Sequence, residues 1–132
     1  MFRDARRAYE TGARTSQSNR ELEAEALFKA ARKLEHARQH WHTPERDALL
    51  LEAVRYNQRL WTFFQGELAS PSHPLPRALR HDVLRLSTFV ERRLLEVLGQ
   101  PDPARLAVVI EINRQLAHGL KGEVTAGADS AR

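Results

Sequence analysis

Apolar residues recur three or four positions apart in four stretches of the chain, a spacing typical of amphipathic helices. The first stretch follows a capping-box pattern, in which Ser18 and Glu21 bond to each other's backbone N–H groups. Its apolar stripe consists of Leu27, Ala30, Ala31, Leu34, Ala37 and Trp41. The second stretch begins with Thr43 as N-cap and Pro44 at the first helical position, and it continues to Ala69. We therefore expect two helices in the first half of the chain.

The second of these helices is expected to be the long central one. Its first half is apolar around more than one face, through Leu49, Leu50, Leu51, Ala53 and Val54. Its second half carries three aromatic residues, of which Trp61 and Phe64 share a face with Leu68. Gly66 interrupts good helix formers, which indicates either fraying or the close approach of a neighbour.

A proline-rich segment separates the second helix from a third. Ser70-Pro71 stops the helix, because proline disfavours α geometry in the residue before it. Pro74 and Pro76 keep the connection short, and a third helix is predicted over 76–98. Its expected buried face consists of Leu79, Val83, Leu86, Val90, Leu94 and Val97. The two helices should fold back on each other as a helical hairpin around a tight turn.

A fourth helix is predicted to begin at Pro103, with Asp102 as its cap, and to end at Gly119 and Gly122. Its expected buried face consists of Leu106, Val109, Ile110, Asn113, Leu116 and Leu120. The pattern thus predicts an all-α, compact four-helix bundle-like protein. We divide the chain into a flexible N-terminal arm (1–17), a single helical domain (18–122) and a disordered tail (123–132).

Composition narrows the class of protein. The 132 residues suit a single soluble domain, and 29% of them are charged, with a net charge of +4. The absence of cysteine excludes disulfides, thiolate metal sites and cysteine nucleophiles. No apolar run approaches the ~18 residues of a membrane span, so we expect a cytoplasmic protein without membrane insertion.

The sequence offers no site for catalysis or for a cofactor. His36 and His40 have the i, i+4 spacing of a helical metal site, with His42 just beyond, but no acidic pattern of the metalloprotease kind surrounds them. We interpret them as a solvated face. No nucleophile elbow, phosphate-binding glycine loop or paired carboxylates stand out, so we expect no enzyme and no cofactor.

Several short motifs resemble the FlaF family of flagellar biosynthesis regulators. The central ones are Leu60-Trp61-x-Phe63, Leu68-Ala69-Ser70-Pro71, Leu75-Pro76 and Leu79-Arg80. Flanking pieces in the family's order are Arg20-Glu21-x-Glu23-Ala24, Ala30, Leu34, Ile110-Glu111-Ile112-Asn113 and Gly119-Leu120. The chain departs from the family at His73, where asparagine is usual, and at Phe89, where tryptophan is usual.

The resemblance implies a bacterial flagellum assembly factor. Such a protein would bind unpolymerised flagellin as an export chaperone and regulate flagellin synthesis. Flagellin monomer is therefore the expected partner, and other flagellar regulatory proteins are further candidates. The terminal segments of flagellin form helices, which would suit an apolar surface left open beside the second helix. The oligomeric state stays open.

The candidate flagellin-binding residues cluster around the proline-rich turn. They are Trp61, Phe63, Phe64, Leu68, His73 and Leu75. Aromatic residues at helical spacing are ordinarily core, and we expect that role for Trp61 and a contact role for part of the neighbourhood of Phe63, Phe64 and His73. The alternative is a post-transcriptional regulator that binds RNA directly through a basic stripe on the third helix, formed by Arg77, His81, Arg85 and Arg92. No aromatic residues interleave with this stripe, so nucleic-acid binding is disfavoured.

Overall fold

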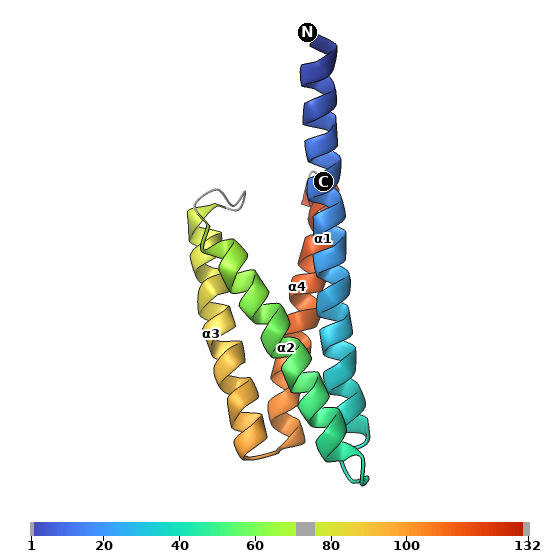
Figure 1. Ribbon diagram of the computed structural model, residues 1–132, viewed down its shortest axis with the longest axis vertical. Helices are drawn as coiled ribbons and strands as arrows, with labels where there is room; N and C mark the ends of the chain where they lie inside the picture. Colours follow the sequence, from blue (N-terminus) through green and yellow to red (C-terminus); the bar gives the residue numbers. More distant parts are fainter. Residues whose placement is uncertain (1, 71–75, 131–132) are drawn as a thin grey trace.

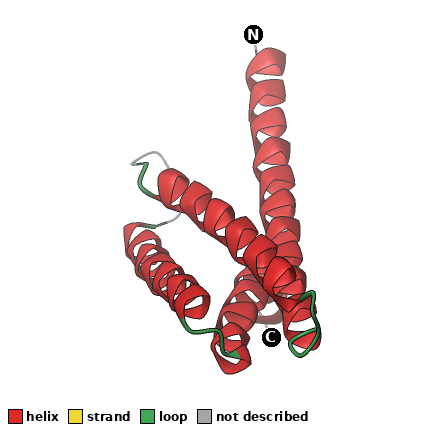
Figure 2. Ribbon diagram, turned by 60° about the horizontal axis from the view of Figure 1, so that its bottom comes forward, coloured by secondary structure: helices red, strands yellow, loops and turns green. Residues whose placement is uncertain are grey.

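The computed structural model describes the backbone of residues 2–70 and 76–130, and the side chains of residues 19–70 and 76–122. This part of the chain forms four helices: α1 (Phe2–Gln39), α2 (Arg46–Leu68), α3 (Arg77–Gly99) and α4 (Pro103–Ser130). Figure 2 shows helices and loops but no strand in it. The predicted all-α four-helix class is therefore confirmed.

The helices form a ring of neighbours in the order α4, α1, α2, α3, with α3 returning to α4 (Figure 1). Helices α1 and α4 run antiparallel. Phe28 of α1 packs edge-on against His118 of α4, and Glu25, about one turn earlier on α1, pairs with Lys121, about one turn later on α4. The N-terminal turns of α1 extend beyond the other helices.

The core follows the predicted apolar stripes closely. Every member of the stripe on α1 is buried, and four alanines on that helix are at most 1% exposed: Ala24, Ala30, Ala31 and Ala37. Small side chains let neighbouring backbones approach, and the larger volumes come from the partners. The larger fully buried side chains of the core are Trp61 on α2, Leu94 and Val97 on α3, and Leu106 and Val109 on α4.

The predicted central position of α2 is confirmed, but its predicted length is wrong. Side chains of α2 reach all three other helices, since Asn57 bonds to α1, Gln65 to α3 and Trp61 to α4. However, α2 has 23 residues, as α3 does, whereas α1 has 38. No atom lies within 4 Å of a Cβ built at Gly66, and α2 continues through it, so a close approach does not explain this glycine.

Several predicted helix ends are also wrong. The backbone is helical from Phe2, so Ser18 lies inside α1 and does not cap it. Thr43 donates its hydroxyl to the His40 carbonyl at 2.8 Å, and α2 begins after Glu45 without a side-chain cap. Gly119 and Gly122 do not end α4, which runs to Ser130.

Other predicted features around α3 and α4 are confirmed. Asp102 accepts from the backbone N–H of Ala104 at 2.9 Å and so caps α4, whose first residue is Pro103. Helix α3 ends at Gly99. The division of the chain at residues 17 and 122 stays a prediction. Within residues 2–70 and 76–130, no helix combines the length and hydropathy that a membrane span requires.

Candidate partner-binding surface

Trp61 is a core residue and not a surface anchor. Its side chain is 0% exposed, and its indole Nε1–H donates to Asn113 Oδ1 at 3.0 Å. The ring also meets Phe64 edge-on, with centroids 6.0 Å apart. The core role expected for Trp61 agrees with this burial, and a flagellin contact through Trp61 stays a prediction.

Two buried amides extend the bond from Trp61 into a relay that crosses three helices. Asn113 Nδ2 donates to Asn57 Oδ1 at 2.7 Å, and Asn57 Nδ2 donates to the carbonyls of Ala53 and Ala30 at 2.8 and 3.2 Å. Both asparagines are 0% exposed. Unpaired buried amides are costly, so the relay favours one register of α1, α2 and α4.

The other predicted contact residues divide into three groups. Phe64 and Leu68 are only 6% and 5% exposed, so they belong to the core of the free chain, and a flagellin contact through them stays a prediction. Phe63 points outward and is 54% exposed. His73 and Leu75 lie outside the described residues.

A polar clamp holds the α2–α3 hairpin together near the predicted signature. Gln65 Nε2 donates to Ser87 Oγ at 3.0 Å, and Ser87 donates onward to the Leu84 carbonyl at 2.6 Å. Arg80 donates to the Ser70 carbonyl at 2.7 Å and so joins the start of α3 to the end of α2. The predicted helical hairpin is present, and these bonds fix the direction of α3.

Apolar side chains on α3 and α4 are incompletely covered. The two helices meet at their connection, where Arg105 donates to the carbonyls of Glu96 and Gln100 at 3.4 and 3.3 Å. They diverge away from that connection (Figure 1). Partly buried residues there are Val83 and Leu86 of α3 and Ile112, Leu116 and Leu120 of α4.

We call these five residues, together with Leu79, the α3/α4 face. Leu79 is 50% exposed, so its predicted place in the buried face of the third helix is wrong. Helical spacing puts Leu79, Val83 and Leu86 on the side of α3 that also carries the buried Val90. The α3/α4 face is therefore the open continuation of the core, and Phe89, 38% exposed, lies at its rim.

The basic stripe of α3 lies on a different side of the same helix. Arg77, His81, Arg85 and Arg92 are all exposed, whereas the buried residues of α3 are Ser87, Val90, Leu94 and Val97. The exposed positions agree with a solvated charged face. An RNA contact through these residues stays a prediction.

A carboxyl pair joins α1 to α2 near the C-terminal end of α2. Burial, the hydrogen bond to Glu67 and the charge of Glu67 together raise the pKa of Glu23 to about 7, and Arg20 acts in the opposite direction. The two carboxyls bond only while one of them holds a proton. Glu23 lies within a motif of the predicted family, but sequence alone gave no sign of this pairing.

The histidines of the first helix show no metal-binding geometry. His36 and His40 stack with ring centroids 4.3 Å apart, and His40 Nδ1 lies 2.9 Å from the His36 carbonyl oxygen. Among the side chains that the structure describes, no three histidine, aspartate or glutamate residues group around a possible metal position.

The comparison with known families agrees with the motifs. The model of the flagellar protein FlaF family matches residues 5–120, which is most of the 132-residue chain. No curated protein and no solved structure matches it. The matched range includes the relay, the hairpin clamp and the α3/α4 face. The chain belongs to the FlaF family of flagellar proteins.

Proposed function

We propose that this protein binds unpolymerised flagellin in the cytoplasm, acts as its export chaperone without catalytic turnover, and through this capture regulates flagellin synthesis. The observation that carries the proposal is the α3/α4 face, where core-type side chains continue to the surface. Membership of a flagellar family supports the choice of partner.

The chemistry of the α3/α4 face suits an amphipathic helix. Leu79, Val83 and Leu86 follow helical spacing along α3, and Leu116 and Leu120 do so along α4. A partner helix can match such rows with apolar residues at i, i+3, i+4 and i+7. Covering these side chains removes apolar surface from water at about 25 cal/mol per Å². The relay holds α4 to α2, and the hairpin clamp holds α3 to α2. The α3/α4 face is therefore preorganised, which lowers the entropy cost of binding.

Seeded filament growth tests the chaperone function. Purified flagellin monomer is mixed with short filament seeds, and light scattering follows elongation. An equimolar amount of this protein should slow elongation, because captured monomer cannot add to a filament end. Unchanged elongation in the presence of excess protein would reject the proposal.

Direct RNA binding by the α3 stripe is the second hypothesis, and salt distinguishes the two. Binding to phosphates through Arg85 and Arg92 should weaken steeply as salt rises, because counterions are rebound. Apolar docking on the α3/α4 face should change little. A pull-down from motile cells would show whether protein or RNA accompanies the chain.

A further inference from the structure

The side of the molecule opposite the α3/α4 face carries more cations than carboxylates. Residues 26–34 of α1 and 53–66 of α2 run alongside each other and contain no aspartate or glutamate. Their cations are Lys29, Arg32, Lys33, Arg55 and Arg59, and all but Lys33 are exposed. This excess of positive charge remains among the described residues after the internal ion pairs are counted.

Tyr56 organises the centre of this surface. The Nζ atoms of Lys29 and Lys33 lie 5.5 and 5.4 Å from the centre of its ring, so the aromatic ring holds two cations. Lys33 also pairs with Glu52 at 2.7 Å. The hydrogen bond and charge of Lys33 lower the pKa of Glu52, with smaller contributions from His36 and Lys29, so Glu52 stays ionised but neutralises only one of its neighbours.

Exposed apolar side chains border the cations at one end of this surface. Leu22 is 65% exposed and Phe63 is 54% exposed. Leu22 lies seven residues before Lys29 on α1, and Phe63 lies seven residues after Tyr56 on α2. Because Lys29 contacts Tyr56 and the two helices are antiparallel, Leu22 and Phe63 lie at the same end of the surface.

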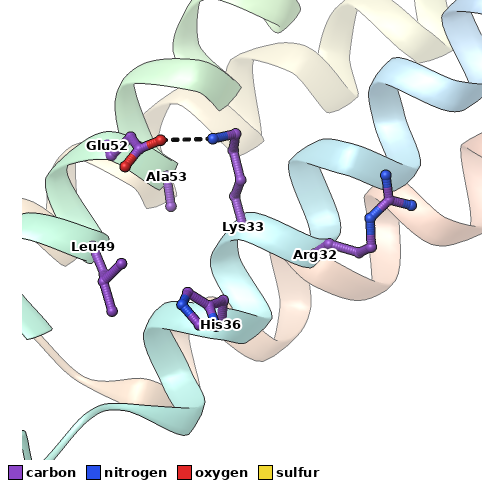
Figure 3. A pocket seen from close by; sticks show the side chains of 6 residues that line it. All are labelled: Arg32, Lys33, His36, Leu49, Glu52 and Ala53. Carbon is purple, nitrogen blue, oxygen red and sulfur yellow. Dashed lines mark hydrogen bonds and ion pairs between the residues drawn. The ribbon is translucent and has the colours of Figure 1, made fainter.

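The other end holds a pocket of about 160 Å³. Its apolar wall is formed by Leu49 and Ala53 of α2, and its charged and polar lining consists of Glu52 of α2 with Arg32, Lys33 and His36 of α1. In Figure 3, Lys33 reaches across to Glu52, whereas the guanidinium of Arg32 points away from this ion pair. The surface thus has exposed apolar side chains at one end, cations in its middle, and at the other end a pocket with an apolar wall and charged neighbours. From Leu22 to His36 it spans about 21 Å at ~1.5 Å per helical residue.

We propose that this surface, the α1/α2 outer face, binds an acidic amphipathic helix of a partner protein. Such a helix would be about four turns long, would place carboxylates against Lys29 and Arg59, and would seat apolar side chains on Phe63 and in the pocket. A nucleic acid fits less well, because base stacking needs open ring faces and lysines cover Tyr56. The proposal is independent of flagellin binding, since α1 and α2 lie opposite the α3/α4 face in the ring of helices.

The probe is a fluorescein-labelled helical peptide of about 16 residues, with leucine and phenylalanine in its first and last turns and glutamate between them. Fluorescence anisotropy at low salt should show saturable binding. The double variant Lys29→Glu/Arg59→Glu should weaken it at least about tenfold, because attraction becomes repulsion. The control is Arg85→Glu/Arg92→Glu, which changes the net charge by the same amount but on α3. It should keep the affinity for the peptide within about twofold.

Three results would overturn the proposal. The first is equal weakening by the two charge-reversal pairs, which would mean that only net charge matters. The second is unchanged affinity in Lys29→Glu/Arg59→Glu. The third is tighter binding of a labelled single-stranded RNA, lost in that same variant. Seeded filament growth in the presence of Lys29→Glu/Arg59→Glu separates this proposal from flagellin capture. The variant should still slow filament elongation, because flagellin capture is assigned to the α3/α4 face.

Discussion

The indole of Trp61 on α2 donates to the side-chain oxygen of Asn113 on α4, at 3.0 Å and entirely out of contact with solvent. Asn113 in turn donates to Asn57, whose amide reaches the Ala30 carbonyl of α1. One chain of hydrogen bonds thus sets the register of three helices. The largest aromatic residue of the family motif therefore positions the bundle.

Asn113→Ala should destabilise the fold by about 2 to 5 kcal/mol. The change leaves the Trp61 N–H and Asn57 Oδ1 buried without partners, at about 1 to 3 kcal/mol each. Chemical denaturation measures the loss, with the exposed neighbour variant Arg114→Ala as a control expected within about 0.5 kcal/mol. Equal stability of Asn113→Ala and the native protein would show that the relay does not hold the helices in register.

Truncation of two neighbouring phenylalanines on α2 should destabilise the fold by different amounts. Phe64→Ala empties a site that is 6% exposed and should cost about 3 to 4 kcal/mol, whereas Phe63→Ala removes a ring that is 54% exposed and should cost under about 1 kcal/mol. Thermal melts of the two variants check this. Similar losses in both would contradict the assignment of Phe64 to the core and Phe63 to the surface.

The Glu23–Glu67 pair should make stability fall as pH rises. The folded-state pKa of Glu23 is raised to about 7 from its ordinary value of 4.5, so the folded chain holds more protons than the unfolded chain between these values. The stabilisation is complete below pH 4.5 and is lost as pH rises through 7. Because Glu23 is only partly buried, we expect about 1 to 2 kcal/mol after screening.

Free energies of unfolding at pH 5 and pH 8 measure this effect. The variant Glu23→Gln should flatten the difference between the two pH values. Glu25→Gln is the matched control, because the hydrogen bond from Lys121 lowers the pKa of Glu25 and so gives no loss in this range. An unchanged pH dependence in Glu23→Gln would exclude the pair as its cause.

Much of the fold could be predicted because many residues that helical spacing placed on a buried face are in fact buried in the structure. Leu27, Leu94 and Leu106 were each placed on a buried face by spacing alone, and each is fully buried. Helix ends were less predictable. Thr43 has the residue type of an N-cap, yet its hydroxyl turns back to the preceding helix, a choice that depends on where His40 lies.

The candidate site was harder to predict because core and contact positions favour the same side chains. Phe63 and Phe64 differ only in the direction in which each leaves α2. Leu79 keeps the core period of α3 but lies where α3 has diverged from α4, and divergence is a tertiary property. Asn57 and Asn113 did leave a signal, since each is an amide at a position where the helical period calls for an apolar residue.

Calorimetric titration of flagellin monomer into this protein at several temperatures tests the central claim most directly. We predict a complex at micromolar concentration with a negative heat-capacity change, because apolar surface is buried. Leu79→Ser/Phe89→Ser should weaken it by about 2 kcal/mol or more, whereas Leu95→Ser/Leu98→Ser, on another side of α3, should leave it unchanged. Absence of binding at micromolar concentration, or binding that both double variants leave intact, would contradict the assignment of the α3/α4 face to flagellin.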